Sequence, residues 1–139
     1  MRTLIALALL TAPAHAWEFS AAPICTLTHT ENGAEVTVTY DHATRLYAIA
    51  LTTADGWPAA PTFSMRFDGA NPNTISTPRH EISGTTLTVT DTGFGNVLDG
   101  LQYNQTATAF TNTAAITLSL DGAAQPVEQF RACTTAPIA

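Results

Sequence analysis

Histidine is the first residue type to consider for metal binding or catalysis, because it serves both as a metal ligand and as a general base. The histidines after residue 16 are His29, His42 and His80. No two of them stand at the short spacings of common zinc-binding motifs. A metal site would therefore form only if folding brought the three together, and we assign neither a metal ligand nor a cofactor.

The six aspartates fall where turns are expected. Four directly precede a glycine, namely Asp55, Asp68, Asp99 and Asp121. Such pairs favour tight turns, because the carboxylate bonds the local backbone while glycine takes a positive φ. Asp41 and Asp91 also lie at expected turns. No serine occurs in a Gly-x-Ser-x-Gly or Ser-x-x-Lys pattern, so we predict a protein that is not an enzyme.

Recognition chemistry has more candidates than catalysis. Trp57 lies in a loop rich in turn residues and could anchor a partner; the alternative is that it folds back over one end of the domain. The segment Asp91–Asn96 could form a polar pocket, or simply reverse the chain. His80 belongs to the charged Arg79–Glu81 loop, which could contact a partner. The alternative is that these residues form an ordinary solvated loop. The predicted contact surface comprises Trp57, His80, Asp91 and Asn96.

Residues 1–16 have the pattern of a signal peptide. Arg2 provides a positive start, Leu4–Leu10 an apolar stretch, and Ala14–Ala16 a cleavage site of small residues. We expect residues 17–139 to form a single domain that is periplasmic or secreted. No apolar run reaches the roughly 20 residues of a membrane helix, so no membrane span is expected.

Export bears directly on the two cysteines, Cys25 and Cys133. An even count in an oxidising compartment predicts a disulfide between them, and the alternative is two free thiols. The bridge would enclose 107 residues. In the chain-entropy model, closing a loop of that length stabilises a fold by about 4–5 kcal/mol.

The net negative charge of the chain limits the kinds of partner that it can bind. After residue 16, eleven aspartates and glutamates face four arginines, a formal charge of −7, and lysine is absent. An acidic surface repels phosphate backbones, so nucleic-acid binding is disfavoured. Without lysine, the chain has neither a Walker A phosphate loop nor Schiff-base chemistry.

The elements that must position these residues are mostly strands, because apolar and polar residues alternate. Asn32-Gly33 between two such runs predicts a hairpin. Strands are expected over residues 24–30, 34–40, 46–52, 62–67, 85–90, 106–110 and 115–120, with a short extended piece around Ile75. Helical spacing occurs over Phe94–Leu101 and after Pro126, which suits a first helical position. We predict a mainly β protein, an antiparallel β-sandwich of about seven to nine strands with one or two short helices, closed by a terminal disulfide.

The C-terminal third carries a resemblance to a known family. Residues 96–101, 106–110, 118–123 and 130–133 are similar to the closing helix, strand, strand and helix of small periplasmic proteins of the invasion-associated locus B type. Those proteins are exported, β-rich and without established catalysis, and they occur in alphaproteobacteria. The family's usual Gly-Phe is Gly122-Ala123 here. The resemblance implies location and architecture.

A second resemblance runs through Trp17, the Phe67–Gly69 turn and Gly93–Val97. These residues are similar to short exported proteins of marine and phototrophic alphaproteobacteria, some of which carry the label of the B component of excinuclease ABC. That label implies an ATP-driven DNA-repair helicase. An exported, acidic chain without lysine does not fit such an activity, so we do not carry it over.

Taken together, these features predict an exported, non-enzymatic envelope or periplasmic protein that acts through protein or ligand contacts, with an envelope protein as the candidate partner. Two alternatives stay open. One is an inhibitor of a cell-wall hydrolase whose inhibitory loop lies around Trp57 or His80. The other is a metal-dependent hydrolase whose site, built from His29, His42 and His80, forms only on folding.

Overall fold

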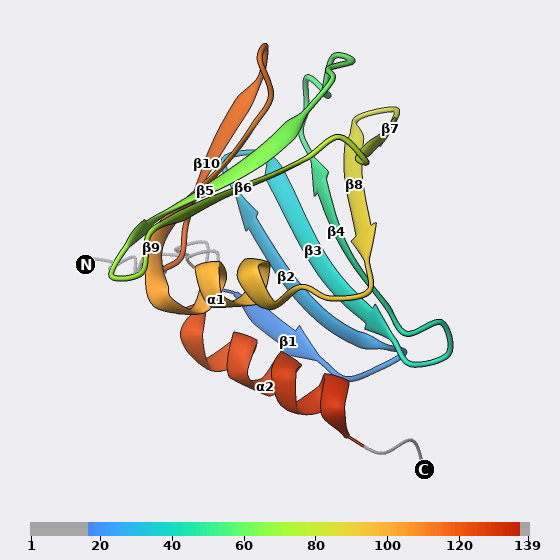
Figure 1. The fold of residues 1–139 in the computed structure, drawn as a ribbon. Coiled ribbons are helices and arrows are strands. Elements are labelled where there is room, and N and C mark those ends of the chain that lie inside the picture. Colours follow the sequence, from blue (N-terminus) through green and yellow to red (C-terminus); the bar gives the residue numbers. More distant parts are fainter. Residues whose placement is uncertain (1–16, 137–139) are drawn as a thin grey trace, which may run out of the picture.

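Two antiparallel sheets face each other in the computed structural model, which describes residues 17–136 (Figure 1). The larger sheet has the order β1-β2-β3-β4-β8-β7, with β1 (Glu18–Ser20), β2 (Cys25–Glu31), β3 (Ala34–Asp41), β4 (Leu46–Thr52), β7 (Glu81–Ser83) and β8 (Thr86–Asp91). The smaller sheet has the order β10-β9-β5-β6, with β5 (Phe63–Gly69), β6 (Asn73–Thr77), β9 (Asn104–Phe110) and β10 (Ala115–Ser119). The predicted β-sandwich is confirmed, while the predicted leader lies outside the described residues.

Local sequence accounts for most of these strands. In β3, Val36 and Val38 are fully buried, and the intervening threonine faces outward, as the period of two requires. The hairpin between β2 and β3 turns at Asn32 and Gly33, with φ of 50° and 81°. Both residue types tolerate the left-handed region that this tight turn needs. The Asn-Gly prediction is therefore confirmed.

The short strands β1 and β7 were not predicted. Each is three residues long and lies at an edge of the larger sheet. Three residues are too few to show an alternating pattern, and Glu81, the first residue of β7, was predicted to lie in a loop. Their pairing depends on the neighbouring strands, β2 and β8, which supply the hydrogen-bonding edge.

Two helices cover one end of the sandwich. Helix α1 (Gly95–Tyr103) contacts β5, β6 and β9, and α2 (Ala124–Thr135) packs on α1, β1 and β2 (Figure 1). Helix α2 begins two residues before Pro126, so this proline holds the third helical position and not the predicted first. The Val127 amide donates to the Ala123 carbonyl at 3.0 Å. Earlier amides need no partner inside the helix, so the missing N–H of Pro126 is harmless there.

The predicted disulfide is present between Cys25, the first residue of β2, and Cys133, near the end of α2. The two Cα atoms are 5.9 Å apart and the sequence separation is 108. The bridge ties the second helix to the larger sheet. In the part of the chain that the structure describes, neither helix is long and apolar enough to cross a membrane.

One hydrophobic cluster joins both sheets and both helices, and it includes Phe67 of β5 and Phe130 of α2. Gly100 brings α1 close to this core. A Cβ atom at Gly100 would overlap the Phe67 ring, so only glycine lets the helix lie this near to β5. The close approach fixes the position of α1, whose start forms one end of the cleft described next.

Candidate ligand-binding cleft

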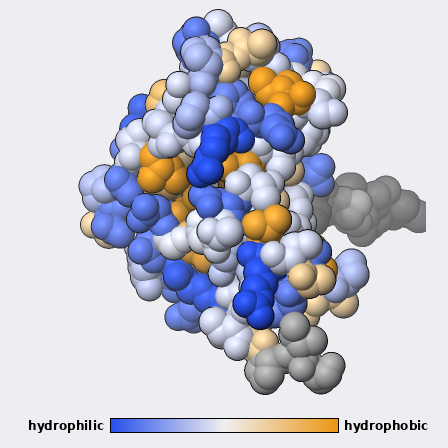
Figure 2. Space-filling model, turned by 45° about the vertical axis from the view of Figure 1, so that its right-hand side comes forward, coloured by the Kyte–Doolittle hydropathy of each residue, from blue (hydrophilic) through white to orange (hydrophobic). Residues whose placement is uncertain are grey.

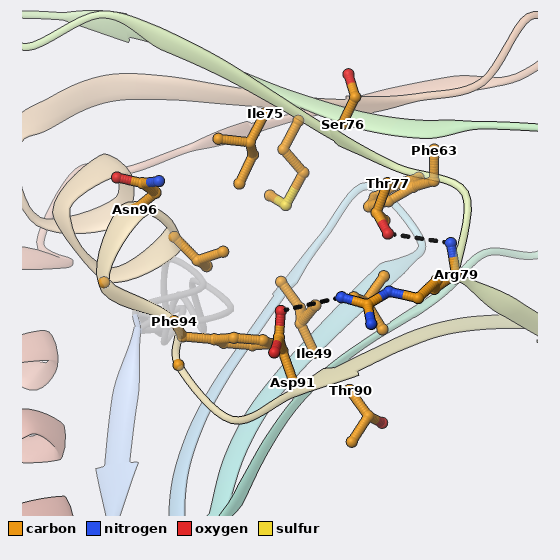
Figure 3. Close-up of a pocket in the computed structure, with 15 residues that line it drawn as sticks. Ile49, Phe63, Ile75, Ser76, Thr77, Arg79, Thr90, Asp91, Phe94 and Asn96 are labelled. Atoms are coloured by element: carbon orange, nitrogen blue, oxygen red, sulfur yellow. Dashed lines mark hydrogen bonds and ion pairs between the residues drawn. The ribbon is translucent and has the colours of Figure 1, made fainter.

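A cleft of about 360 Å³ opens between the two sheets beside the start of α1 (Figure 3). Its walls are apolar and consist of Ile49, Phe63, Met65, Ile75, Val89, Phe94 and Val97. Its rim is polar and includes Thr77, Arg79, Asp91 and Asn96. A volume of this size falls within the range of small-molecule sites, which begins at about 300 Å³.

The alternation of the strands explains why the walls are apolar. Met65 of β5 pairs with Ile75 of β6, and Ile49 of β4 pairs with Val89 of β8. Members of such a pair share one face of their sheet, and here both pairs line the cleft from opposite sheets. Their neighbours Ser76 and Thr90 point away from the space (Figure 3). The two strand pairs therefore form facing walls.

The cleft is open because both sheets end beside it. Strand β6 is the edge of the smaller sheet. On the outer side of β8, β7 pairs with Thr86–Thr88 only, so within the described chain Val89–Asp91 have no strand beyond them on that side. The backbone of β6 and the end of β8 thus flank an open mouth between the layers.

An ion pair spans this mouth. The Nη2 atom of Arg79 lies 3.7 Å from Oδ2 of Asp91, and the two side chains are 75% and 44% exposed (Figure 3). Asp91 Oδ1 accepts the Thr92 amide at 2.7 Å, and the Arg79 amide donates to Thr77 Oγ1 at 3.0 Å. Exposed pairs contribute only about 0–1 kcal/mol. The pair can therefore separate at little cost in free energy.

Two of the four predicted contact residues meet at this rim. Asp91, at the end of β8, and Asn96, in the first turn of α1, both line the cleft. His80 does not line it. The His80 ring lies 6.3 Å from that of Phe63, which does, and its Nδ1 has no hydrogen-bond partner among residues 17–136. The segment Asp91–Asn96 thus lies at the cleft, and His80 lies next to it.

Trp57 is a core residue. Its side chain is 4% exposed, its Nε1 donates to the Leu51 carbonyl at 3.0 Å, and its ring lies edge-on to Phe63. Burial with a satisfied N–H is the stable solution for an indole. The structure therefore follows the alternative in which Trp57 folds back, and the predicted contact surface at this position is corrected.

The histidines are spread over three different environments. His29 stacks on Trp17 and its Nε2 lies 2.9 Å from Glu31 Oε1, whereas His42 lies edge-on to Tyr40. His80 is beside Phe63. Among the described residues, no group of three or more histidine, cysteine, aspartate and glutamate side chains could hold a metal ion. Within residues 17–136, His29, His42 and His80 therefore do not come together as the metal-dependent hydrolase alternative requires.

Two further hollows lie elsewhere on the molecule. One, of about 500 Å³, includes Gln102 and Asn104. Gln102 Oε1 accepts the Arg131 Nε–H at 2.8 Å, and Asn104 bonds the backbone of Asn71 and Gly100. The other, of about 420 Å³, is lined by turn residues around Gly33 and Gly56, by Trp57 and by Ala114–Ile116, so it also has apolar walls. Both hollows are larger than the inter-sheet cleft, but only the cleft has a pair of opposite charges in its lining.

Sequence reasoning missed Arg79 and the apolar walls. Arg79 was interpreted as part of a solvated loop, and its positive charge just after β6, in an acidic chain, was the only local signal. Among the wall residues, Met65 belongs to the buried core itself, and the partly buried Ile75 and Val89 have the same alternating pattern as core residues. Only the arrangement of the two sheets distinguishes a wall from a core.

One face of the molecule carries no broad apolar surface. In Figure 2, hydrophobic side chains form separate patches between hydrophilic ones, and on this face they do not merge into one large surface. Extended apolar patches mark protein or membrane contacts. Comparison of the chain with protein-family models, curated protein sequences and solved structures gave no match. The resemblance to the invasion-associated locus B type therefore stays a prediction.

Proposed function

We propose that this chain is an exported, non-enzymatic binding protein that holds a small amphipathic ligand in the cleft between its sheets. One observation carries the proposal. Apolar walls from β4, β5, β6 and β8 and the charged rim residues Arg79 and Asp91 meet around a single space. A mostly apolar pocket with a few convergent polar groups is the usual form of a small-molecule site.

Export is supported by two independent features. The signal-peptide pattern of residues 1–16 directs a chain across a membrane. The Cys25–Cys133 bridge suits an oxidising compartment, where disulfides persist. The resemblance to periplasmic proteins implies the same location. We therefore propose the periplasm, or the space beyond it, as the place of binding.

A binding role fits the chemistry of the lining better than catalysis does. Ser76 turns its hydroxyl away from the cleft and lies 2.7 Å from the Ser64 hydroxyl, while Asp91 faces a guanidinium (Figure 3). Nucleophilic catalysis needs a hydroxyl or thiol beside a base. The lining residues instead provide apolar contact and a pair of opposite charges.

A fluorescence titration with the apolar dye N-phenyl-1-naphthylamine tests the proposal. Ile75→Trp adds bulk to a wall of the cleft, on an edge strand where an aromatic residue is well tolerated. The matched control is Ile82→Trp, because Ile82 is also a partly buried isoleucine on an edge strand but lies outside the cleft.

We expect the wild type and Ile82→Trp to bind the dye with the same affinity, and Ile75→Trp to bind it at least tenfold more weakly. Circular dichroism of each variant checks that the fold is kept. Equal affinity of all three proteins, or no binding by the wild type, would contradict a ligand site between the sheets.

A further inference from the structure

The rim of the cleft carries information about the head group of the ligand. Arg79 lies in the connection between β6 and β7, and Asp91 is the last residue of β8, so the two charges come from opposite sides of the mouth. Their separation of 3.7 Å exceeds the about 2.7–2.9 Å of a charge-assisted hydrogen bond. The two groups attract each other, but each retains bonding capacity for a third partner.

A ligand with a single charge gains little from this pair. An anion placed at the rim is attracted by Arg79 and repelled by Asp91, and at similar distances the two Coulomb energies nearly cancel. A cation meets the same cancellation with the signs reversed. Moreover, the formal charge of −7 after residue 16 disfavours the approach of a free anion.

A ligand that carries both charges side by side gains both attractions. When its dipole runs antiparallel to the Arg79–Asp91 pair, the ammonium faces Asp91 and the carboxylate faces Arg79, whose planar guanidinium accepts a two-point contact. The two charged groups of an α-amino acid are attached to one carbon atom, so their separation suits a pair 3.7 Å apart. Such a ligand has no net charge, so the acidic surface does not repel it.

We infer that the cleft selects compact zwitterions with an apolar side chain, as in a free apolar or aromatic α-amino acid. The inference rests on the proposed function and names its ligand class. The side chain lies between Met65, Ile75 and Val89, and Asn96 and Thr77 offer uncharged hydrogen-bonding groups at the rim. A phosphocholine head on a short alkyl chain shares this chemistry and represents a lipid source.

Calorimetric titration with three matched ligands measures how much the ammonium and the carboxylate of the ligand each contribute to affinity. L-phenylalanine carries both groups, phenethylamine lacks the carboxylate, and 3-phenylpropionate lacks the ammonium. We expect L-phenylalanine to bind at least tenfold more tightly than either singly charged ligand. Hexylphosphocholine, compared with hexyl phosphate, is the lipid arm, and the arm whose zwitterion binds more tightly assigns the source of the ligand.

Variants of the rim test the assigned partners. Asp91→Asn is expected to weaken L-phenylalanine binding and to strengthen that of 3-phenylpropionate, whereas Arg79→Gln is expected to favour phenethylamine. The control is the double variant Arg66→Gln/Asp68→Asn, which removes another exposed pair, 3.0 Å apart, outside the cleft. We expect this control to leave all three affinities unchanged.

Different results would overturn the head-group inference and the proposed ligand-binding function. If the singly charged ligands bind as tightly as their zwitterions in both arms while the naphthylamine dye still binds in the cleft, the head-group inference is overturned and the proposed function stands. If the dye does not bind either, both the head-group inference and the proposed function are overturned. A tenfold preference that is insensitive to Arg79→Gln and Asp91→Asn also overturns the inference, because the assigned charges would not be its cause.

Discussion

The indole of Trp17 lies flat on the imidazole of His29, with ring centroids 4.5 Å apart and planes 4° from parallel. Around this stack, Trp17 Nε1 donates to the Ser119 carbonyl at 2.9 Å, and Glu31 Oε1 accepts the Ser119 amide at 2.8 Å. Glu31 also lies 2.9 Å from His29 Nε2. The first described residue is thereby tied to β10 of the opposite sheet.

Trp17→Ala is expected to lower the free energy of unfolding by about 3–5 kcal/mol, the usual effect of removing a large buried aromatic side chain. Trp17 is 3% exposed, so the loss leaves a cavity. Trp17→Phe keeps a ring but loses the bond to Ser119, which is worth about 1 kcal/mol. Urea denaturation measures both, with the exposed neighbour Glu18→Ala as the control. A change below about 1 kcal/mol for Trp17→Ala would contradict a structural role.

Replacing both cysteines with serine is expected to lower the free energy of unfolding by about 2–5 kcal/mol. The bridge between Cys25 and Cys133 closes a loop with a sequence separation of 108, so its removal frees a long segment of the unfolded chain. Wild-type protein unfolded in urea with and without reductant provides the comparison. If reduction leaves the midpoint unchanged, the disulfide does not stabilise the domain.

Gly100→Ala is expected to destabilise the protein by about 1–3 kcal/mol, as overpacked cores usually are. Alanine improves helix propensity by about 1 kcal/mol, but its Cβ would overlap the Phe67 ring. The overlap is the larger effect, because both Gly100 and the Phe67 ring are buried. Gly95→Ala is the control in the same helix, since nothing lies within 4 Å of a Cβ there. Thermal denaturation in which both variants gain stability would show that α1 can move away from β5.

Asn104→Ala is expected to destabilise the fold by about 1–3 kcal/mol and to weaken dye binding in the cleft. The buried Asn104 side chain accepts the Asn71 amide at 2.9 Å and donates to the Asn71 and Gly100 carbonyls at 2.8 and 3.1 Å. Its loss removes the buried bond to the Gly100 carbonyl and both bonds to the Asn71 backbone. The same bonds fix the β5–β6 hairpin to α1, two sides of the cleft. Exposed Gln105→Ala is the control, and equal stability of the two variants would contradict this role.

Much of the fold followed from local sequence. The turn at Asn32-Gly33, the inward valines of β3 and the helical spacing of residues 94–101 each depend on near neighbours, and each was predicted. The disulfide followed from the leader pattern and an even cysteine count. These features need no knowledge of which strands meet in space.

The parts that were missed depend on tertiary contacts. Asp99 was assigned to a turn, yet it lies within α1 and pairs with Arg131 of α2 at 2.6 Å. Trp57 is buried because its loop returns to Leu51 and Phe63. Arg79 and Asp91 are joined only after β6 and β8 take places in different sheets. No local sequence pattern specifies these contacts between residues that are distant in the chain.

The most direct test of the ligand-binding cleft is a two-dimensional amide NMR titration with the naphthylamine dye, which reports where the ligand sits. The account predicts that the largest shifts occur at Ile75, Val89, Asp91 and Asn96, on both walls and the rim of one space, and that Gln105 and Gly33, beside the other hollows, stay unchanged. Shifts centred on Gln105 or Gly33, or spread evenly over the surface, would contradict it.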